Sequence, residues 1–478
     1  MQSPDEKPQK SIPAFKLAQI GGNCKSAAFT YNRPMRRILT ITLILAILLP
    51  GPAQALSIIR DAEIENTLKI YTNSTFKAAG LNPDVMHIYI INDPSINAFT
   101  VGGLNIFINT GLILRTDNSN MIIGVIAHET GHVVGGHIIK RMGEIDDLTV
   151  QTILTTLLGA AVTVAGLPDA GMAVMAGGQH VAERNFLTYS REQEVAADAA
   201  AVRFLNATHQ SVKGMLRLFD ILRREQTLAY GDIDPYTVNH PLSEERIEHI
   251  RSLAMSEDIP DTDKYAYLQS RMVAKLHGFL EKPDITFLKY TDESEFSLYA
   301  RSIAYFQQSD FKNSFAELDK LLALKPEDPF YNELKGQFLV ESGHPRDGVP
   351  YYEKANRLFP NSSLIKNELG KNLLGENRLD EAIAVLSQAA KLEHTNEETW
   401  HLLATAYGKK NDEGMTNLML AEEANISDKN KDARKFARIA KDKLPKNSPG
   451  WLRANDILSD IKLNKKDKED NDKDKDDK

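Results

Sequence analysis

The five residues His128-Glu-Thr-Gly-His132 constrain this chain more than any other stretch. They follow an apolar run over residues 121–127 whose composition favours a helix. On a helix, side chains four positions apart lie on one face, so His128 and His132 can both reach a single metal ion. Glu129 follows the first histidine, where its carboxylate can reach a water molecule on that metal. This H-E-x-x-H pattern is typical of a zinc peptidase, but it fixes only three positions and requires a third protein ligand.

Glu194 is the predicted third ligand. One class of zinc peptidase takes a third histidine from the spacing H-E-x-x-H-x-x-G-x-x-H, but position 138 is isoleucine here and His137 comes one residue early. The other class uses a glutamate from a later helix. Glu194 and Asp198 are four residues apart among small side chains, so they share a helical face that can pack closely on the H-E-x-x-H helix. We expect Glu194 to bind the metal and Asp198 to accept a hydrogen bond from a ligand imidazole.

Two other polar residues near these motifs are alternatives. Glu192 is a carboxylate on the same expected helix as Glu194, but it lies off the face that Asp198 defines. His137 is expected to be a polar residue or a hydrogen-bonding neighbour of a metal ligand. Two imidazoles and one carboxylate favour zinc over other divalent ions, at one ion per chain.

The expected chemistry is hydrolysis of a peptide bond without a covalent intermediate. Zinc with three protein ligands keeps one tetrahedral position for water and lowers the pKa of that water to about 7. Glu129 would take the proton as general base and pass it to the leaving amine. The sequence indicates no nucleophilic serine or cysteine site, and the sole cysteine, Cys24, lies in a segment expected to be absent from the mature protein.

Four ordered motifs resemble the superfamily of CAAX prenyl proteases and heat-shock proteases. They are N-A-F-T-V-G-G at 97–103, H-E-T-G-H at 128–132, S-R-E-Q-E-V-A-A-D at 190–198 and H-P-L-S-E-E-R at 240–246. Within this superfamily the chain is most similar to the periplasmic beta-barrel assembly-enhancing proteases, which carry tetratricopeptide repeats after the protease domain. The resemblance implies a periplasmic zinc protease that acts in quality control and assembly of outer-membrane proteins.

The resemblance also implies that His240 and Arg246 lie near the active site. His240 is an auxiliary catalytic candidate, because it could donate a hydrogen bond to the oxyanion or close the resting zinc as a removable fourth ligand. Arg246 is expected to lie beside the metal ligands as a supporting residue. The alternative for His240 is a structural histidine in a proline-containing turn, ahead of a helix expected over residues 243–253.

Two strands are expected over residues 85–91 and 103–109, on either side of the turn signal Asn92-Asp-Pro94. In zinc peptidases an edge strand beside the active-site helix pairs with the substrate backbone. Gly102 and Gly103 would permit close backbone approach, and they are therefore candidates for substrate binding. A purely structural sheet is equally compatible with the sequence.

The N-terminal region has the features of an export signal. Met35-Arg-Arg37 precedes an apolar run and the cleavage pattern Ala53-Gln-Ala55, so residues 35–55 are expected to be a signal peptide and the periplasm to be the compartment. An uncleaved signal anchor is the alternative. Residues 1–34 are polar and irregular, and we expect them to be a non-native or unstructured extension.

Residues 148–178 form a second hydrophobic stretch, between the two metal-binding motifs. Gln151 and several threonines and glycines dilute it, so we expect a helix and loop that cover the active site and make peripheral contact with a membrane surface. A membrane-embedded zinc protease is the alternative.

A repeat of 34 residues organises the C-terminal half. Ser302, Gly336, Gly370 and Ala404 are all small and fall at this interval, where the two helices of a tetratricopeptide repeat cross. We expect four helix pairs from about residue 295, followed by capping helices near 431–444 and 451–461. Such an array presents a concave surface for docking, although a scaffold that merely covers the protease is the alternative.

The predicted fold class is α+β, mostly α: a zincin domain of the gluzincin type with a small β-sheet, followed by an all-α tetratricopeptide-repeat solenoid. The expected limits are 56–256 for the zinc metalloprotease domain, 257–294 for a partly helical linker, 295–462 for the repeats and 463–478 for a disordered charged tail.

The expected substrates are unfolded or stalled outer-membrane proteins, and the expected partner of the repeats is the outer-membrane assembly machinery; both follow from the resemblance. A net charge of −8 gives no sign of nucleic-acid binding. The main alternative is a chaperone or assembly adaptor whose protease is largely latent.

Overall fold

The computed structural model describes residues 57–101, 104–137, 189–228, 235–254 and 262–461. All of them belong to one of the two units into which contacts divide the chain, residues 54–478. Several predictions concern other segments: the extension 1–34, the signal peptide 35–55, the pair Gly102 and Gly103, the apolar stretch 148–178 and the tail 463–478 all lie outside the described residues.

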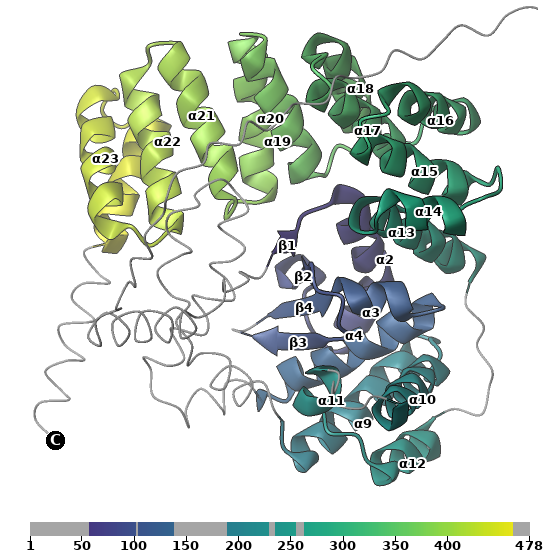
Figure 1. The fold of residues 1–478 in the computed structure, drawn as a ribbon. Coiled ribbons are helices and arrows are strands. Elements are labelled where there is room, and N and C mark those ends of the chain that lie inside the picture. The colour runs from purple at the N-terminus through teal and green to yellow at the C-terminus, as the bar shows by residue number, and fades with distance from the viewer. Residues whose placement is uncertain (1–56, 102–103, 138–188, 229–234, 255–261, 462–478) are drawn as a thin grey trace, which may run out of the picture. The chain divides into compact units, whose positions relative to one another are not determined.

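A four-stranded sheet lies beside the helices that carry the metal-binding motifs (Figure 1). Its strands are β1 (Ile58–Ile59), β2 (His87–Ile91), β3 (Ala98–Val101) and β4 (Asn105–Asn109), in the order β1-β2-β4-β3. β2 pairs with β4 in parallel, whereas β1 and β3 are antiparallel to their neighbours. The two predicted strands are therefore confirmed with shorter limits, and β3, which the sequence did not identify as a strand, lies at the edge next to β4.

Seven α-helices accompany the sheet within the described residues up to 254. They are α2 (Ala62–Ala78), α3 (Thr110–Arg115), α4 (Ser119–Val134), α9 (Arg191–Ala207), α10 (Lys213–Leu228), α11 (Pro235–Asn239) and α12 (Glu244–Leu253). Side-chain caps mark the start of the three helices that carry predicted site residues. Asn118 caps α4, Ser243 caps α12, and Ser190 forms a reciprocal capping box with Gln193 at the start of α9.

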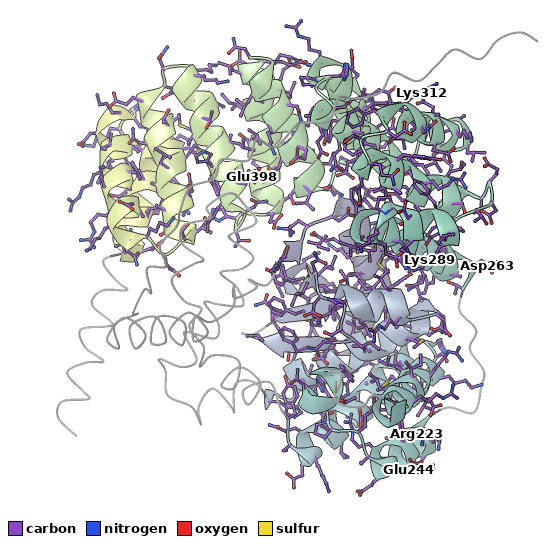
Figure 2. The ribbon with its side chains drawn as sticks, in the orientation of Figure 1. Arg223, Glu244, Asp263, Lys289, Lys312 and Glu398 are labelled. Carbon is purple, nitrogen blue, oxygen red and sulfur yellow. The ribbon has the colours of Figure 1, made fainter. Side chains whose placement is uncertain are left out.

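Small residues allow helices α4, α9 and α10 to pack closely. A Cβ atom on Gly131 of α4 would lie 2.7 Å from the Ala197 carbonyl oxygen of α9. A Cβ atom on Gly214 of α10 would lie 2.2 Å from the Asn120 carbonyl oxygen of α4. At the surface, Arg223 of α10 and Glu244 of α12 lie close together, with Arg223 Nη1 3.2 Å from Glu244 Oε2 (Figure 2). The metal-binding helix α4 is therefore held between two others at short range.

The residues expected to form a linker are largely helical. They contain α13 (Asp263–Leu280) and α14 (Pro283–Lys289). Met272 and Leu276 of α13 are buried in the same hydrophobic core as the sheet and α4. α13 therefore packs as part of the core that supports the metal-binding helices.

Four helix pairs follow, as the 34-residue period predicts (Figure 1). They are α15 (Glu295–Gln307) with α16 (Phe311–Leu324), α17 (Pro329–Glu341) with α18 (Pro345–Leu358), α19 (Ser363–Gly375) with α20 (Leu379–Leu392), and α21 (Glu397–Lys409) with α22 (Glu413–Ile426). α23 (Asn430–Lys443) and a helix over residues 449–461 complete the described part of the array. Gly370 marks a crossing, since a Cβ there would lie 2.4 Å from Leu386 Cγ.

The turn inside each pair repeats with the same period. Ser309, Gly343, Asn377 and Asn411 are 34 residues apart, and their φ angles are 60°, 90°, 63° and 59°. Such left-handed backbone favours glycine and, among the others, asparagine. The repeat is therefore conserved in backbone conformation even where the residue type changes.

None of the described helices combines the length and the hydrophobicity that spanning a bilayer requires. The segment 148–178, on which the prediction of membrane contact rests, lies outside those residues.

Candidate metal centre

His128, His132, Glu194 and His240 come together in the interior, and one potential ligand atom from each lies within 4.8 Å of the others. All four side chains have 0 % exposure. The Nε2 atoms of His128 and His132 are 3.1 Å apart, and they lie 3.4 and 3.3 Å from the two carboxylate oxygens of Glu194. Helix α4 contributes the two histidines and α9 the glutamate, in the arrangement that the sequence predicts. The competing carboxylate, Glu192, is exposed on α9.

His240, the first residue after α11, is the fourth member of the cluster. Its Nδ1 atom lies 3.0 Å from Glu194 Oε1 and 3.3 Å from His128 Nε2. On its other side, Nε2 is 3.3 Å from the Ala98 carbonyl oxygen of β3. The ring stacks on Tyr236 of α11, with centroids 4.5 Å apart. His240 thus contacts both the potential ligands and the edge strand.

Glu129 is buried beside this cluster with 0 % exposure. Neither of its carboxylate oxygens has a hydrogen-bond partner among the described residues, and Oε1 lies 3.4 Å from His240 Nε2. Burial raises the pKa of Glu129 to about 7, against the opposing effect of His240 and His128. A buried carboxylate without a partner is costly unless a cation or a bound water satisfies it. The unpartnered carboxylate of Glu129, together with the imidazole and carboxylate donors beside it, fits a zinc site.

Asp198 and Arg246 support the ligands from behind. His128 Nδ1 lies 2.9 Å from Asp198 Oδ1. Arg246 donates to both oxygens of Asp198, at 2.7 and 2.9 Å, and also to the Pro241 carbonyl oxygen at 2.8 Å. Its Nη1 atom is 2.7 Å from Glu194 Oε2. One guanidinium therefore fixes α9, two of its carboxylates and the turn that holds His240.

The charged and titratable side chains of the cluster shift one another's pKa values. Burial opposes ionisation of Glu194 and Asp198, but the facing histidines hold the pKa of Glu194 well below its ordinary range, and His128 together with Arg246 holds the pKa of Asp198 below its ordinary range. Against the opposing effect of burial, Asp198 and Glu194 raise the pKa of His128 to about 10. Burial lowers the pKa of His132 well below its ordinary value. Zinc binds neutral imidazole, so a metal ion would displace the proton of His128.

One aromatic residue beside the cluster, Tyr189, was not assigned from the sequence. The Tyr189 ring stacks on His132 at 3.7 Å, and its hydroxyl lies 3.0 Å from Thr100 Oγ1. Tyr189 directly precedes the motif at 190–198, which is the one signal that could have identified it. His137, expected as a polar residue or as a hydrogen-bonding neighbour of a metal ligand, places Nδ1 2.9 Å from His132 Nδ1. The remaining candidates, Gly102 and Gly103, lie outside the described residues.

Comparison with known families agrees with this geometry. Residues 60–254 match Peptidase family M48, and residues 339–406 match a tetratricopeptide repeat. The fold and site therefore define the class as a metallopeptidase domain joined to helical repeats. Residues 60–254 therefore form a domain similar to the peptidases of family M48. The predicted family and fold class are confirmed.

Individual relatives are distant. The chain is 25% identical over 256 residues to the beta-barrel assembly-enhancing protease of Yersinia pestis, with 52% of each chain covered. It is 22% identical over 337 residues to the protein of the same name from Escherichia coli K12, with 67% of each chain covered. It is 26% identical over 200 residues to metalloprotease LoiP of the same organism, covering 42% of this chain and 74% of that protein. The aligned part spans about half the length of the Yersinia relative.

Proposed function

We propose that this chain is a zinc-dependent endopeptidase, with one zinc ion held by His128, His132 and Glu194. The observation that carries the proposal is the meeting of the H-E-x-x-H residues of α4 with Glu194 of α9 in one buried cluster. Two imidazoles and a carboxylate are a common ligand set of catalytic zinc.

Glu129 is the proposed general base. Bound zinc would activate water and polarise the scissile carbonyl. A carboxylate with a pKa of about 7 can both take a proton from a nucleophile and return it to a leaving amine near neutral pH. Burial of Glu129 excludes bulk water, and its position one residue after His128 on α4 keeps it at the cluster.

We propose that His240 closes the resting site and leaves when substrate binds. At the start of β3, the Asn97 carbonyl oxygen accepts a hydrogen bond from Asn109 N of β4. In an antiparallel pair, successive carbonyl groups of a strand point alternately towards and away from the neighbouring strand, so the Ala98 carbonyl points away from β4. A substrate backbone that pairs with this edge needs the Ala98 oxygen, which lies 3.3 Å from His240 Nε2. The same displacement removes His240 Nδ1 from the potential ligands. This role accounts for both contacts of His240.

The substrates and compartment proposed here rest on the names of the relatives and on the export signal at 35–55. We propose that the enzyme acts in the periplasm on unfolded or stalled outer-membrane proteins, with the repeats docking these clients or the assembly machinery. Part of the repeat surface is already covered within the chain, because Ala62 of α2 packs with Ala355 and Ile365. Docking would therefore use the repeat surface outside this contact.

One observation favours the second candidate, a chaperone or adaptor with a largely latent protease. The proposed ligands, Glu129 and His240 all have 0 % exposure, so no polypeptide reaches them in this conformation. The two candidates differ in whether function requires Glu129.

The test measures zinc content and casein cleavage of residues 56–478. Wild type should bind one zinc per chain and cleave casein, and a chelator should abolish cleavage. Glu194→Ala should lose both zinc and cleavage, whereas Glu129→Gln should keep zinc and lose cleavage. Glu192→Ala is the matched control, because this exposed carboxylate lies on the same helix. Absence of zinc from wild type, or zinc retained in Glu194→Ala, would overturn the proposed site. Cellular function retained in Glu129→Gln would favour the adaptor.

A further inference from the structure

The two proposed ligand histidines of α4 are supported in different ways. Each directs Nε2 towards the cluster and leaves Nδ1 on the outer side of the ring. The outer nitrogen of His128 meets a carboxylate, Asp198, at 2.9 Å. The outer nitrogen of His132 meets another imidazole, since its Nδ1 lies 2.9 Å from His137 Nδ1. Metal-binding histidines usually donate this second N–H to a carboxylate, a carbonyl or water.

The proton positions follow if His132 binds a metal through Nε2, as in the proposed function. A neutral imidazole that coordinates through one nitrogen carries its proton on the other. His132 Nδ1 must then donate, and His137 Nδ1 must accept. His137 is therefore required in the neutral tautomer that carries its own proton on Nε2.

The end of α4 brings His137 to this place. The helix ends at Val134, Gly135 caps it, and Gly136 has a φ of 62°, which reverses the chain. The His137 ring consequently lies over Gly135. A Cβ atom on Gly135 would lie 2.4 Å from His137 Nε2 and 2.8 Å from two ring carbons. Any side chain at 135 would push the ring away from His132.

The geometry points to His137 as the positioning residue of His132: it accepts the Nδ1 proton of that ligand and fixes its orientation for metal binding, and Gly135 leaves the space that this requires. His137 is buried, and its ring is inclined at 75° to that of His132, so the two rings meet through their nitrogens. A residue that merely filled space would have no need to direct Nδ1 at Nδ1. The pair therefore acts as a donor and an acceptor.

The experiment measures the zinc dissociation constant of metal-free residues 56–478 by competition with a chromophoric chelator. His137→Ala removes the acceptor and should weaken zinc binding 10- to 100-fold, the usual effect of losing such a partner. Gly135→Ala should produce a similar loss by displacing the ring. His137→Asn restores a neutral acceptor near the position of Nδ1 and should recover most of the affinity. Val134→Ala is the control, because Val134 is 46% exposed on the same turn.

Thermal unfolding of each metal-free variant separates positioning from folding. The inference requires His137→Ala and His137→Asn to unfold at similar temperatures while they differ in zinc affinity. Zinc binding by His137→Ala within about twofold of wild type would overturn it. Equal losses in His137→Ala and His137→Asn would also overturn it, because a structural role predicts that result. If wild type binds no zinc, or Glu194→Ala binds it normally, the proposed metal site itself fails.

Discussion

Arg271 and Glu63 are 208 positions apart in the sequence, yet Arg271 Nε donates to Glu63 Oε1 over 2.5 Å in the protein interior. The other carboxylate oxygen of Glu63 accepts from the Tyr299 hydroxyl at 2.6 Å. Arg271 also reaches Asp328 at the start of α17. These side chains join α2, α13, α15 and α17. Because α2 and α13 share the core of α4, the first repeats are linked to the metal-binding helix through buried charge.

Arg271→Met should lower the free energy of unfolding by about 3 kcal/mol. It leaves Glu63 ionised and buried without its main partner, and breaking a buried pair costs about 3–5 kcal/mol. We expect a loss at the lower end of this range, because Lys275 Nζ remains 3.5 Å from Glu63 and still partly compensates its charge. Urea unfolding measures the loss of stability. Arg251→Met is the control, because Arg251 forms an exposed ion pair and its substitution should lower the free energy of unfolding by less than about 1 kcal/mol. A loss no larger than that of the control would contradict the prediction, and adding Glu63→Gln should restore most of the stability.

Arg246→Lys should weaken zinc binding 10- to 100-fold and reduce casein cleavage accordingly. Lysine cannot make the two parallel hydrogen bonds to Asp198 and also hold the Pro241 carbonyl. Asp198 then loses the partner that orients it towards His128. Competition with a chelator measures the affinity. Arg223→Lys is the control: Arg223 forms an exposed ion pair on α10, and its substitution should leave the zinc affinity unchanged. Equal zinc affinities of the two variants would refute the role of Arg246.

Stability should fall as the pH rises because of Glu333 on α17. Burial, together with the charges of Asp61, Glu63 and Glu368, raises the pKa of Glu333 to about 8, against the opposing effect of Lys275. Between its ordinary value of 4.5 and about 8, Glu333 binds more protons in the folded than in the unfolded state. Stability from this group is complete at low pH and is lost as the pH rises through that window.

Glu333→Gln should therefore remove this slope. Because Glu333 is only half-buried, solvent screens its charge, and we expect the variant to be about 1–2 kcal/mol more stable than wild type at pH 8.5, with little difference at pH 5. Urea unfolding at both pH values provides the measurement. Glu341→Gln is the control, because it removes an exposed carboxylate from the same helix. A variant that is destabilised at pH 8.5 would show that Glu333 is needed as an ion.

The left-handed turns of the repeats can be exchanged between copies. Gly343→Ser should destabilise by about 1–2 kcal/mol, because it places a side chain at a φ of 90°. Ser309→Gly at the equivalent turn should stabilise by up to about 1 kcal/mol, because the φ of 60° is then unstrained. Thermal unfolding of both variants measures these two changes in stability. Changes of the same sign would show that side-chain contacts, rather than backbone strain, dominate these turns.

The parts of the fold that repeat at short range could be predicted from the sequence. The i, i+4 spacing of His128 and His132 places both on one face wherever α4 packs. The period from Gly336 to Gly370 predicts helix crossings because each repeat meets only its neighbours. Glu194 was predicted to join the histidines because small residues surround it on α9.

The features that could not be predicted from the sequence depend on contacts between segments that are distant in the chain. β3 is only four residues long, and its pairing with β4 places it beside His240. The return of His137 to His132 depends on the positive φ of Gly136, which no periodicity reveals. The Arg271–Glu63 pair joins α13 to α2, and neither residue lies in a motif. In each case tertiary packing selects one conformation among several that the local sequence allows.

The short distance between α4 and α9 has a consequence for mutational scanning. Gly131 and Ala197 bear no functional group, yet a single methyl on Gly131 would meet the Ala197 backbone at 2.7 Å. Pushing the helices apart would move Glu194 away from both histidines at once. A screen for inactive variants should therefore recover substitutions at these two positions as readily as at the histidines. Inactivity alone would then not identify the residues that carry the chemistry.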